Sequence, residues 1–212
     1  MLPRTAAAPI AAWQRFLARL RPAPIASVPE LREFLEARAL LIAQKCAIDY
    51  CRGKTGLASY ALFSEATFLK ALDVCRWEGF AAVLADLLVL AEARLRAHAG
   101  DARPRLDEAL LGLYRAILEA TPPPAHRRDG WQEALAAFPA RFAAACAAEP
   151  QGAVAVAEHS AKRLFDTLPI HSRMRELDQE VVYGAVRFRM VAVHQEMHRR
   201  FDAPALARAL LA

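Results

Sequence analysis

Glycine and cysteine are both scarce in this chain of 212 residues. It holds eight glycines and four cysteines, and aromatic side chains make up only 8% of it. So little glycine excludes a collagen-like repeat, and four cysteines without a Cys-x-x-Cys pair suit neither a disulfide framework nor a zinc site. We expect four buried, reduced thiols that pack as small apolar side chains, which favours a cytoplasmic protein.

Lysine is also rare. Only four of the 28 basic side chains are lysine, and the 23 acidic side chains leave a formal net charge of +5. A basic, arginine-rich exterior suits acidic partners, but the codon usage of a GC-rich genome produces the same composition. The net charge alone therefore does not indicate a function.

Long apolar runs are missing as well. The most apolar segment, residues 79–91, contains Asp86 and is followed at once by Glu92. A membrane-spanning helix needs about 20 mostly apolar residues, so none is predicted. No uninterrupted apolar run follows the N-terminal charges, and we expect no signal peptide.

Alanine, the strongest helix former, is abundant, whereas β-branched residues are sparse and do not alternate. The sequence therefore predicts an all-α bundle of about seven to nine helices with a long central C-terminal helix over residues 170–201. Residues 27–212 are predicted to form a single helical domain with an exposed Pro-rich loop at 121–130. Ser27 and Glu30 predict a capping box, and we expect a helix end near Gly53 and a bend or break at Gly79.

Residues 1–26 are predicted to form a separate amphipathic, basic segment, because the first acidic residue is Glu30. Apolar residues recur at helical spacing over 9–21. A helix of this kind docks on a bundle, binds a membrane surface or acts as an organellar targeting signal. The residues expected to contact a partner or a membrane are Trp13, Arg15, Phe16, Arg19 and Leu20.

Two segments come close to a phosphate-binding loop and a helix-turn-helix, but each lacks residues that its motif requires. Gly53-Lys54-Thr55 lacks the earlier glycine of a phosphate-binding loop, because that position holds Ile48, and a helix rather than a strand precedes it. A helix-turn-helix over residues 43–71 would present a recognition helix without the side chains that read base edges. The sequence therefore disfavours nucleic-acid binding.

The predicted C-terminal helix has two apolar faces separated by a polar stripe. The first face consists of Met174, Leu177, Val181, Phe188 and Ala192. The second face consists of Val182, Val186, Met190, Val193 and Met197. We expect such a helix to be enclosed by neighbours on both sides, which would leave the stripe partly enclosed. Our interpretation of the stripe is a set of polar contacts at the bundle surface, with His194 and His198 solvated, and a ligand site is the alternative. The stripe consists of Glu176, Glu180, Arg187, His194 and His198.

His194 and His198 are four residues apart, so a helix places their imidazoles side by side, as a metal ion requires. Glu196 is one position too late for the zinc-protease pattern, and the chain has no Glu-x-x-His pair of a di-iron bundle. His194 and His198 are therefore candidate metal ligands, and a metal site would require further ligands. No other cofactor is indicated.

No nucleophile paired with a base is visible. We therefore expect a non-catalytic helical interaction protein, an adaptor or assembly factor that binds a protein partner through its arginine-rich surface. One alternative is a small-molecule or metal-binding protein, with or without enzymatic activity, whose pocket is lined by Glu180, Arg187, His194 and His198. A second alternative is a peripheral membrane protein anchored through residues 1–26.

Overall fold

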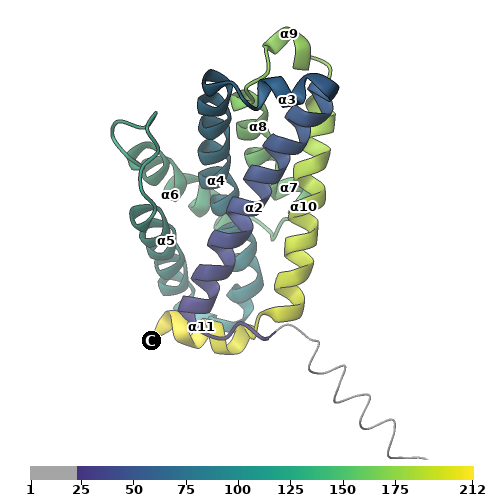
Figure 1. The fold of residues 1–212 in the computed structure, drawn as a ribbon. Helices are drawn as coiled ribbons and strands as arrows, with labels where there is room; N and C mark the ends of the chain where they lie inside the picture. Colours follow the sequence, from purple (N-terminus) through teal and green to yellow (C-terminus); the bar gives the residue numbers. More distant parts are fainter. Residues whose placement is uncertain (1–22) are drawn as a thin grey trace, which may run out of the picture.

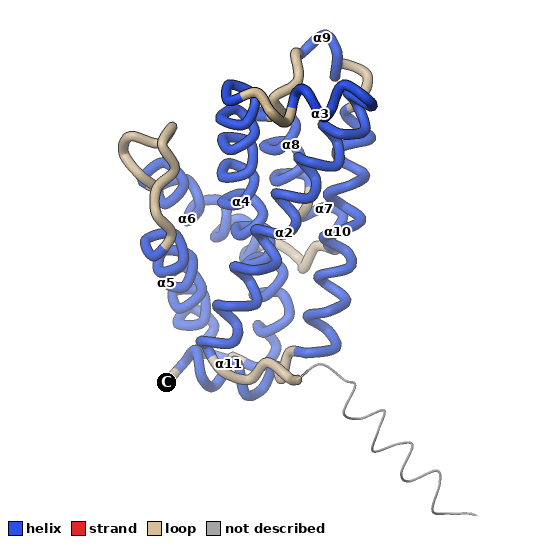
Figure 2. Tube along the Cα trace, viewed as in Figure 1, coloured by secondary structure: helices blue, strands red, loops and turns tan. Residues whose placement is uncertain are grey.

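The computed structural model describes residues 23–212, and all its regular elements are helical (Figure 1). The predicted all-α bundle is confirmed; colouring by secondary structure shows helices and loops alone (Figure 2). The proposed contact residues Trp13, Arg15, Phe16, Arg19 and Leu20 lie outside the described residues.

The longer helices are α2 (Val28–Thr55), α4 (Ala66–Leu95), α5 (Arg103–Ala120), α6 (Gln132–Ala147), α8 (Glu158–Thr167), α10 (Gln179–Arg200) and α11 (Ala203–Leu211). The short helices are α3 (Ser59–Leu62), α7 (Ala153–Val156) and α9 (Ser172–Arg175).

Local sequence signals explain where several of these helices begin and end. The predicted capping box is confirmed, since the Ser27 side chain accepts from the Glu30 amide and Glu30 accepts in return. Helix α2 continues to Thr55 and ends at Gly56, whose φ of 53° suits glycine, so the predicted end at Gly53 is three residues early.

Helix α4 occupies the middle of the bundle and packs against α2, α5, α6, α8 and α10. Its residues 78–92 are buried without interruption, as expected of a helix covered on every side. The predicted break at Gly79 is wrong. A Cβ atom there would lie 2.4 Å from Leu164 Cδ2, so this glycine allows α8 to pack closely against an unbroken helix.

The predicted enclosure of the long C-terminal helix is also wrong. The segment is divided into α9 and α10, and α10 buries one apolar face, from Val182 to Met197, against α2, α7 and α8. The other face remains exposed at Leu177, Val181 and Phe188. Periodicity identified both faces, but among residues 23–212 the central place is taken by α4, which is buried on every side over residues 78–92.

The start of the described chain lies against the C-terminal end of α10. The Ile25 amide donates to the Arg200 carbonyl at 2.7 Å, and the Asp202 amide donates to the Ile25 carbonyl at 3.0 Å. The Pro-rich segment 121–130 is exposed only in part, because Pro124 is buried and the Arg127 side chain is directed inward. Within residues 23–212, no helix combines the length and apolar character needed to cross a bilayer.

Candidate functional site

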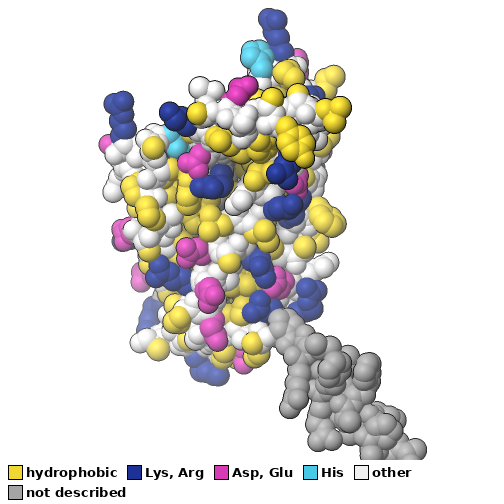
Figure 3. All heavy atoms as spheres, viewed as in Figure 1, with side chains coloured by type: hydrophobic (Ala, Val, Ile, Leu, Met, Phe, Trp, Pro, Cys, Tyr) yellow, Lys and Arg dark blue, Asp and Glu magenta, His cyan; other side chains and the backbone are white. Residues whose placement is uncertain are grey.

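The first candidate region is the exposed face of α10 together with the turn before it, which we call the outer stripe: Leu177, Val181, Gly184, Phe188, Ala192 and Gln195. The exposed fractions are 95% for Leu177, 63% for Val181 and 74% for Phe188. Apolar side chains are visible over α10 and over the adjoining end of the bundle near α3 (Figure 3). From Val181 to Gln195 successive stripe residues are three or four positions apart, so they share one side of α10.

The predicted polar stripe lies along the surface of α10 and the preceding loop and does not surround one cavity. Glu176 and Glu180 are exposed, and Arg187 bridges Glu158 of α8 at 2.7 Å and Glu180 at 3.0 Å. Both acidic groups raise the pKa of Arg187 through these hydrogen bonds. Arg187 therefore connects α10 to α8 and is already ion-paired.

His194 and His198 do lie together, as predicted, with their Nε2 atoms 3.2 Å apart. Burial lowers the pKa of His194, and the neighbouring His198 and Arg94 lower it further. Among residues 23–212, no third imidazole, thiol or carboxylate lies close enough to form a three-ligand group with this pair. A zinc site requires at least three protein ligands, so metal binding at these histidines stays a prediction.

A different group has three possible metal ligands within 4.8 Å of one another: Glu92, Asp107 and Cys146. Its charges do not favour a cation, because Arg96 lies 2.5 Å from Glu92 and Arg103 lies 3.3 Å from it. Burial and, to a smaller extent, the nearby Glu92 raise the pKa of Cys146 to about 12. A thiol that resists ionisation is a poor metal ligand.

The four cysteines are free and buried, as predicted. Burial raises the pKa of Cys75 and Cys51 to about 12 and that of Cys46 to about 11. A nucleophilic cysteine needs a lowered pKa and access to substrate. These thiols therefore pack as small apolar groups.

The second candidate region was not anticipated and centres on Glu78 of α4. This carboxylate is almost fully buried and accepts hydrogen bonds from both sides. Arg127 donates to it through Nε and Nη2, each at 2.7 Å, and His126 lies at 2.8 Å. Arg163 of α8 adds a bond from Nε at 2.9 Å. Burial alone would raise the pKa of Glu78, but the bonds from Arg127 and His126 outweigh it and lower the pKa to about 2.

Asp86 lies two turns further along α4 and is fully buried. Its carboxylate contacts the Arg141 guanidinium of α6, His159 Nδ1 at 3.2 Å and the Ser160 amide at 3.1 Å. Because a carboxylate only accepts, His159 carries its hydrogen on Nδ1, which leaves Nε2 for other contacts. Two helices and one loop thus converge on two acidic groups of a single helix.

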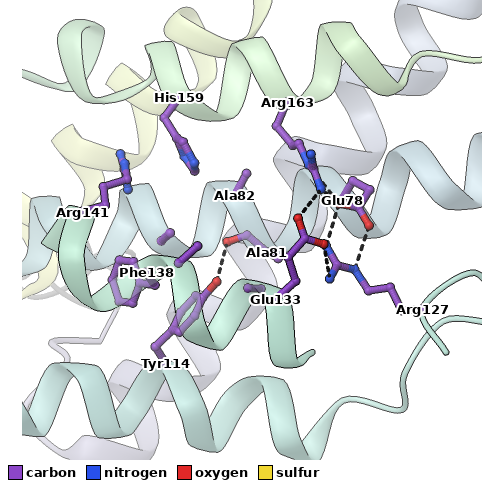
Figure 4. A pocket seen from close by; sticks show the side chains of 13 residues that line it. Glu78, Ala81, Ala82, Tyr114, Arg127, Glu133, Phe138, Arg141, His159 and Arg163 are labelled. Carbon is purple, nitrogen blue, oxygen red and sulfur yellow. Dashed lines mark hydrogen bonds and ion pairs between the residues drawn. The ribbon is translucent and has the colours of Figure 1, made fainter. Parts of the chain in front are cut away.

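Between these two carboxylates lies a cleft of about 190 Å³. Helix α4 supplies an alanine floor, while side chains from α5, α6, α8 and the 121–130 loop form the walls (Figure 4). The polar lining residues are Glu78, Arg127, Glu133, Arg141, His159 and Arg163. The aromatic lining residues are Tyr114 and Phe138.

Comparison with family models, with curated proteins and with solved structures finds no match to this chain.

Sequence reasoning missed the cleft because its parts come from distant segments. Arg127 and Arg163 follow Glu78 by 49 and 85 positions. The available signal was an acidic residue inside an apolar run, as at Asp86, since such a residue needs a buried cationic partner. The sequence shows that a partner is required but not which arginine supplies it.

Proposed function

We propose that this chain is a non-catalytic helical interaction protein whose docking surface is the outer stripe of α10. The observation that supports it is an apolar helix face that no described part of the chain covers. Large exposed apolar side chains grouped on one element are typical of interaction sites. The arginines contribute less to docking than the sequence suggested, because many of them engage carboxylates of the same chain, as Arg38 does with Glu196 at 2.7 Å.

The occupant that best fits the stripe is a second copy of the same chain. Gly184 lies at the middle of the stripe, and a Cβ atom there would meet nothing within 4 Å. An exposed glycine inside a helix costs about 1 kcal/mol relative to alanine, which a close neighbour can offset. In an antiparallel pair with its two-fold axis near residue 186, Phe188 of each copy lies over Gly184 of the other. The same register brings Val181 close to Ala192 of the other copy, so a larger residue meets a smaller one on each side of the axis.

Charge supports the same arrangement. Near a two-fold axis a charged side chain lies close to its own counterpart, so an unpaired arginine would repel its copy. The two arginines that flank the middle of the stripe are both ion-paired within the chain. Arg187 binds Glu158 and Glu180, and Arg189 binds Asp49 at 2.7 Å. The stripe can therefore meet a second stripe without like-charge repulsion.

The test is the mass of the full chain in solution, measured by sedimentation over a range of concentrations. We expect a dimer for the wild type and a monomer for Phe188→Glu. Gly184→Leu fills an open position and should favour the helix, yet it should also weaken the pair because it occupies the place of Phe188. The matched control is Leu41→Glu, which alters a half-exposed leucine on α2 and should leave the dimer intact.

A wild-type chain that stays monomeric at the highest concentration overturns pairing with a second copy. A dimer that survives both stripe variants overturns the assignment of the surface. If the monomer instead floats with phosphatidylserine vesicles and Phe188→Glu abolishes flotation, the stripe is a membrane-binding face and the protein-docking proposal is wrong.

A further inference from the structure

We propose that the cleft between α4, α5, α6 and α8 is a binding site for a small organic monocarboxylate. This inference is independent of how α10 docks, because the cleft is built from other residues. It combines cationic side chains that retain unused donors with an apolar floor in one cleft. Each of these features narrows the chemistry of the ligand.

The charge of the cleft fits a single negative charge. Three guanidinium groups line it, Arg127, Arg141 and Arg163, whereas only two carboxylates are buried beside them, Glu78 and Asp86. The remaining carboxylate, Glu133, lies at the mouth with its side chain 73% exposed, 3.4 Å from Arg127 and 3.6 Å from Arg163. The two buried carboxylates therefore balance two of the three guanidiniums, and only this exposed side chain balances the third. A ligand monoanion would take the place of Glu133, whereas a phosphate dianion would exceed the positive charge available.

The side chains with unused donors all line this cleft. Arg141 Nη1 is buried and has no hydrogen-bond partner, although buried polar groups normally have one. The Arg163 side chain is 40% exposed, which leaves part of its guanidinium for a ligand. His159 uses Nδ1 for Asp86 and retains Nε2. These three side chains come from α6 and α8 and stand around the alanine floor (Figure 4).

Size and apolar surface define the rest of the ligand. Ala81, Ala82 and Ala85 form a smooth floor, and Phe138 and Tyr114 supply aromatic faces. The Tyr114 hydroxyl donates to the Ala81 carbonyl at 3.4 Å, so the ring is held in place. A volume of about 190 Å³ is below the roughly 300–1,000 Å³ typical of sites for drug-sized ligands. The ligand is therefore a compact acid with an apolar or aromatic body.

The experiment is calorimetric titration of the full chain with benzoate. Benzamide serves as the uncharged probe of the same shape, and inorganic phosphate as the dianionic probe. We expect saturable binding of benzoate and none of the other two. Arg163→Gln should weaken binding about tenfold, because hydrogen bonds to charged groups are the strong ones. Arg199→Gln is the matched control, since Arg199 is exposed and lies at the far end of α10.

Two further variants keep the test independent of folding defects. Glu133→Gln removes the competing carboxylate at the mouth without touching a buried group, so it should tighten benzoate binding, whereas Glu119→Gln on the exposed side of α5 should not. Ala82→Leu fills the floor and should abolish binding while leaving every charge in place. The proposal is overturned if benzoate shows no saturable binding in the millimolar range, if benzamide or phosphate binds equally well, or if Ala82→Leu leaves the affinity unchanged.

Discussion

Helices α4 and α10 depart from the usual distribution of side chains in opposite ways. Helix α4 buries three acidic residues, Glu78, Asp86 and Glu92, whereas α10 exposes large apolar ones such as Phe188. Every buried acid of α4 has an arginine partner from its own chain. The outer stripe of α10 has no covering element within residues 23–212. The buried charges of α4 therefore stabilise the fold, whereas the exposed apolar side chains of α10 are available for docking.

The largest effect should come from breaking the charge cluster on α4. Glu78→Gln keeps the volume but removes the charge, which leaves Arg127, with its side chain only 8% exposed, facing a neutral amide. Removing one partner of a buried ion pair costs about 3–5 kcal/mol, and we expect a loss of that order in urea unfolding. Glu133→Gln, at an exposed carboxylate of the same cleft, should change stability by no more than about 0.5 kcal/mol. Equal losses of unfolding free energy in the two variants would show that burial does not increase the contribution of Glu78 to stability.

The same cluster predicts a pH dependence. The pKa of Glu78 is lowered to about 2, because the bonds from Arg127 and His126 outweigh burial, whereas in the unfolded chain it lies near 4.5. Below about pH 5 the unfolded chain takes up this proton first, so stability is lost as the pH falls toward 2 and is fully present above that window. Glu78→Gln cannot take up the proton. The stability difference between wild type and Glu78→Gln should therefore narrow steadily from pH 5 to pH 2 in urea titrations, and a constant difference would contradict the ionised state of Glu78.

Two helix glycines provide a smaller test of the same contrast. Gly79→Ala on α4 would bring Cβ to 2.4 Å from Leu164 Cδ2 in a fully packed region, so we expect a loss of about 1–3 kcal/mol. Gly184→Ala on α10 meets open space and should stabilise the monomer by about 1 kcal/mol through helix propensity alone. Thermal unfolding at low protein concentration compares the two variants without a contribution from pairing. If both substitutions raised the stability, or both lowered it, the surroundings of the two glycines would not differ as the structure shows.

The sequence predicts the local features of this fold but not which distant segments pack against one another. The capping box at Ser27 and Glu30 and the two apolar faces of α10 follow from spacing within one helix. Which face is covered depends on whether another helix is more completely apolar, and that comparison involves the whole chain. Gly79 illustrates the same limit, since a glycine inside a helical pattern predicts a break unless the close approach of Leu164 is known. The cleft residues could not be paired in advance because their carboxylates and arginines are far apart in sequence.

The smallest expected effect on stability belongs to Phe188→Ala, and it is the most informative about α10. Phe188 is 74% exposed, so its truncation creates no cavity and should change the stability of the monomer by no more than about 0.5 kcal/mol. Phe80→Ala in α4 removes a ring that is fully buried and should cost about 3–5 kcal/mol. Unfolding measured at low and high protein concentration separates the two contributions of Phe188. A side chain that serves docking matters only where copies associate, so Phe188→Ala should remove the concentration dependence and leave the low-concentration value almost unchanged. A large loss at low concentration would instead place Phe188 in the fold of the monomer.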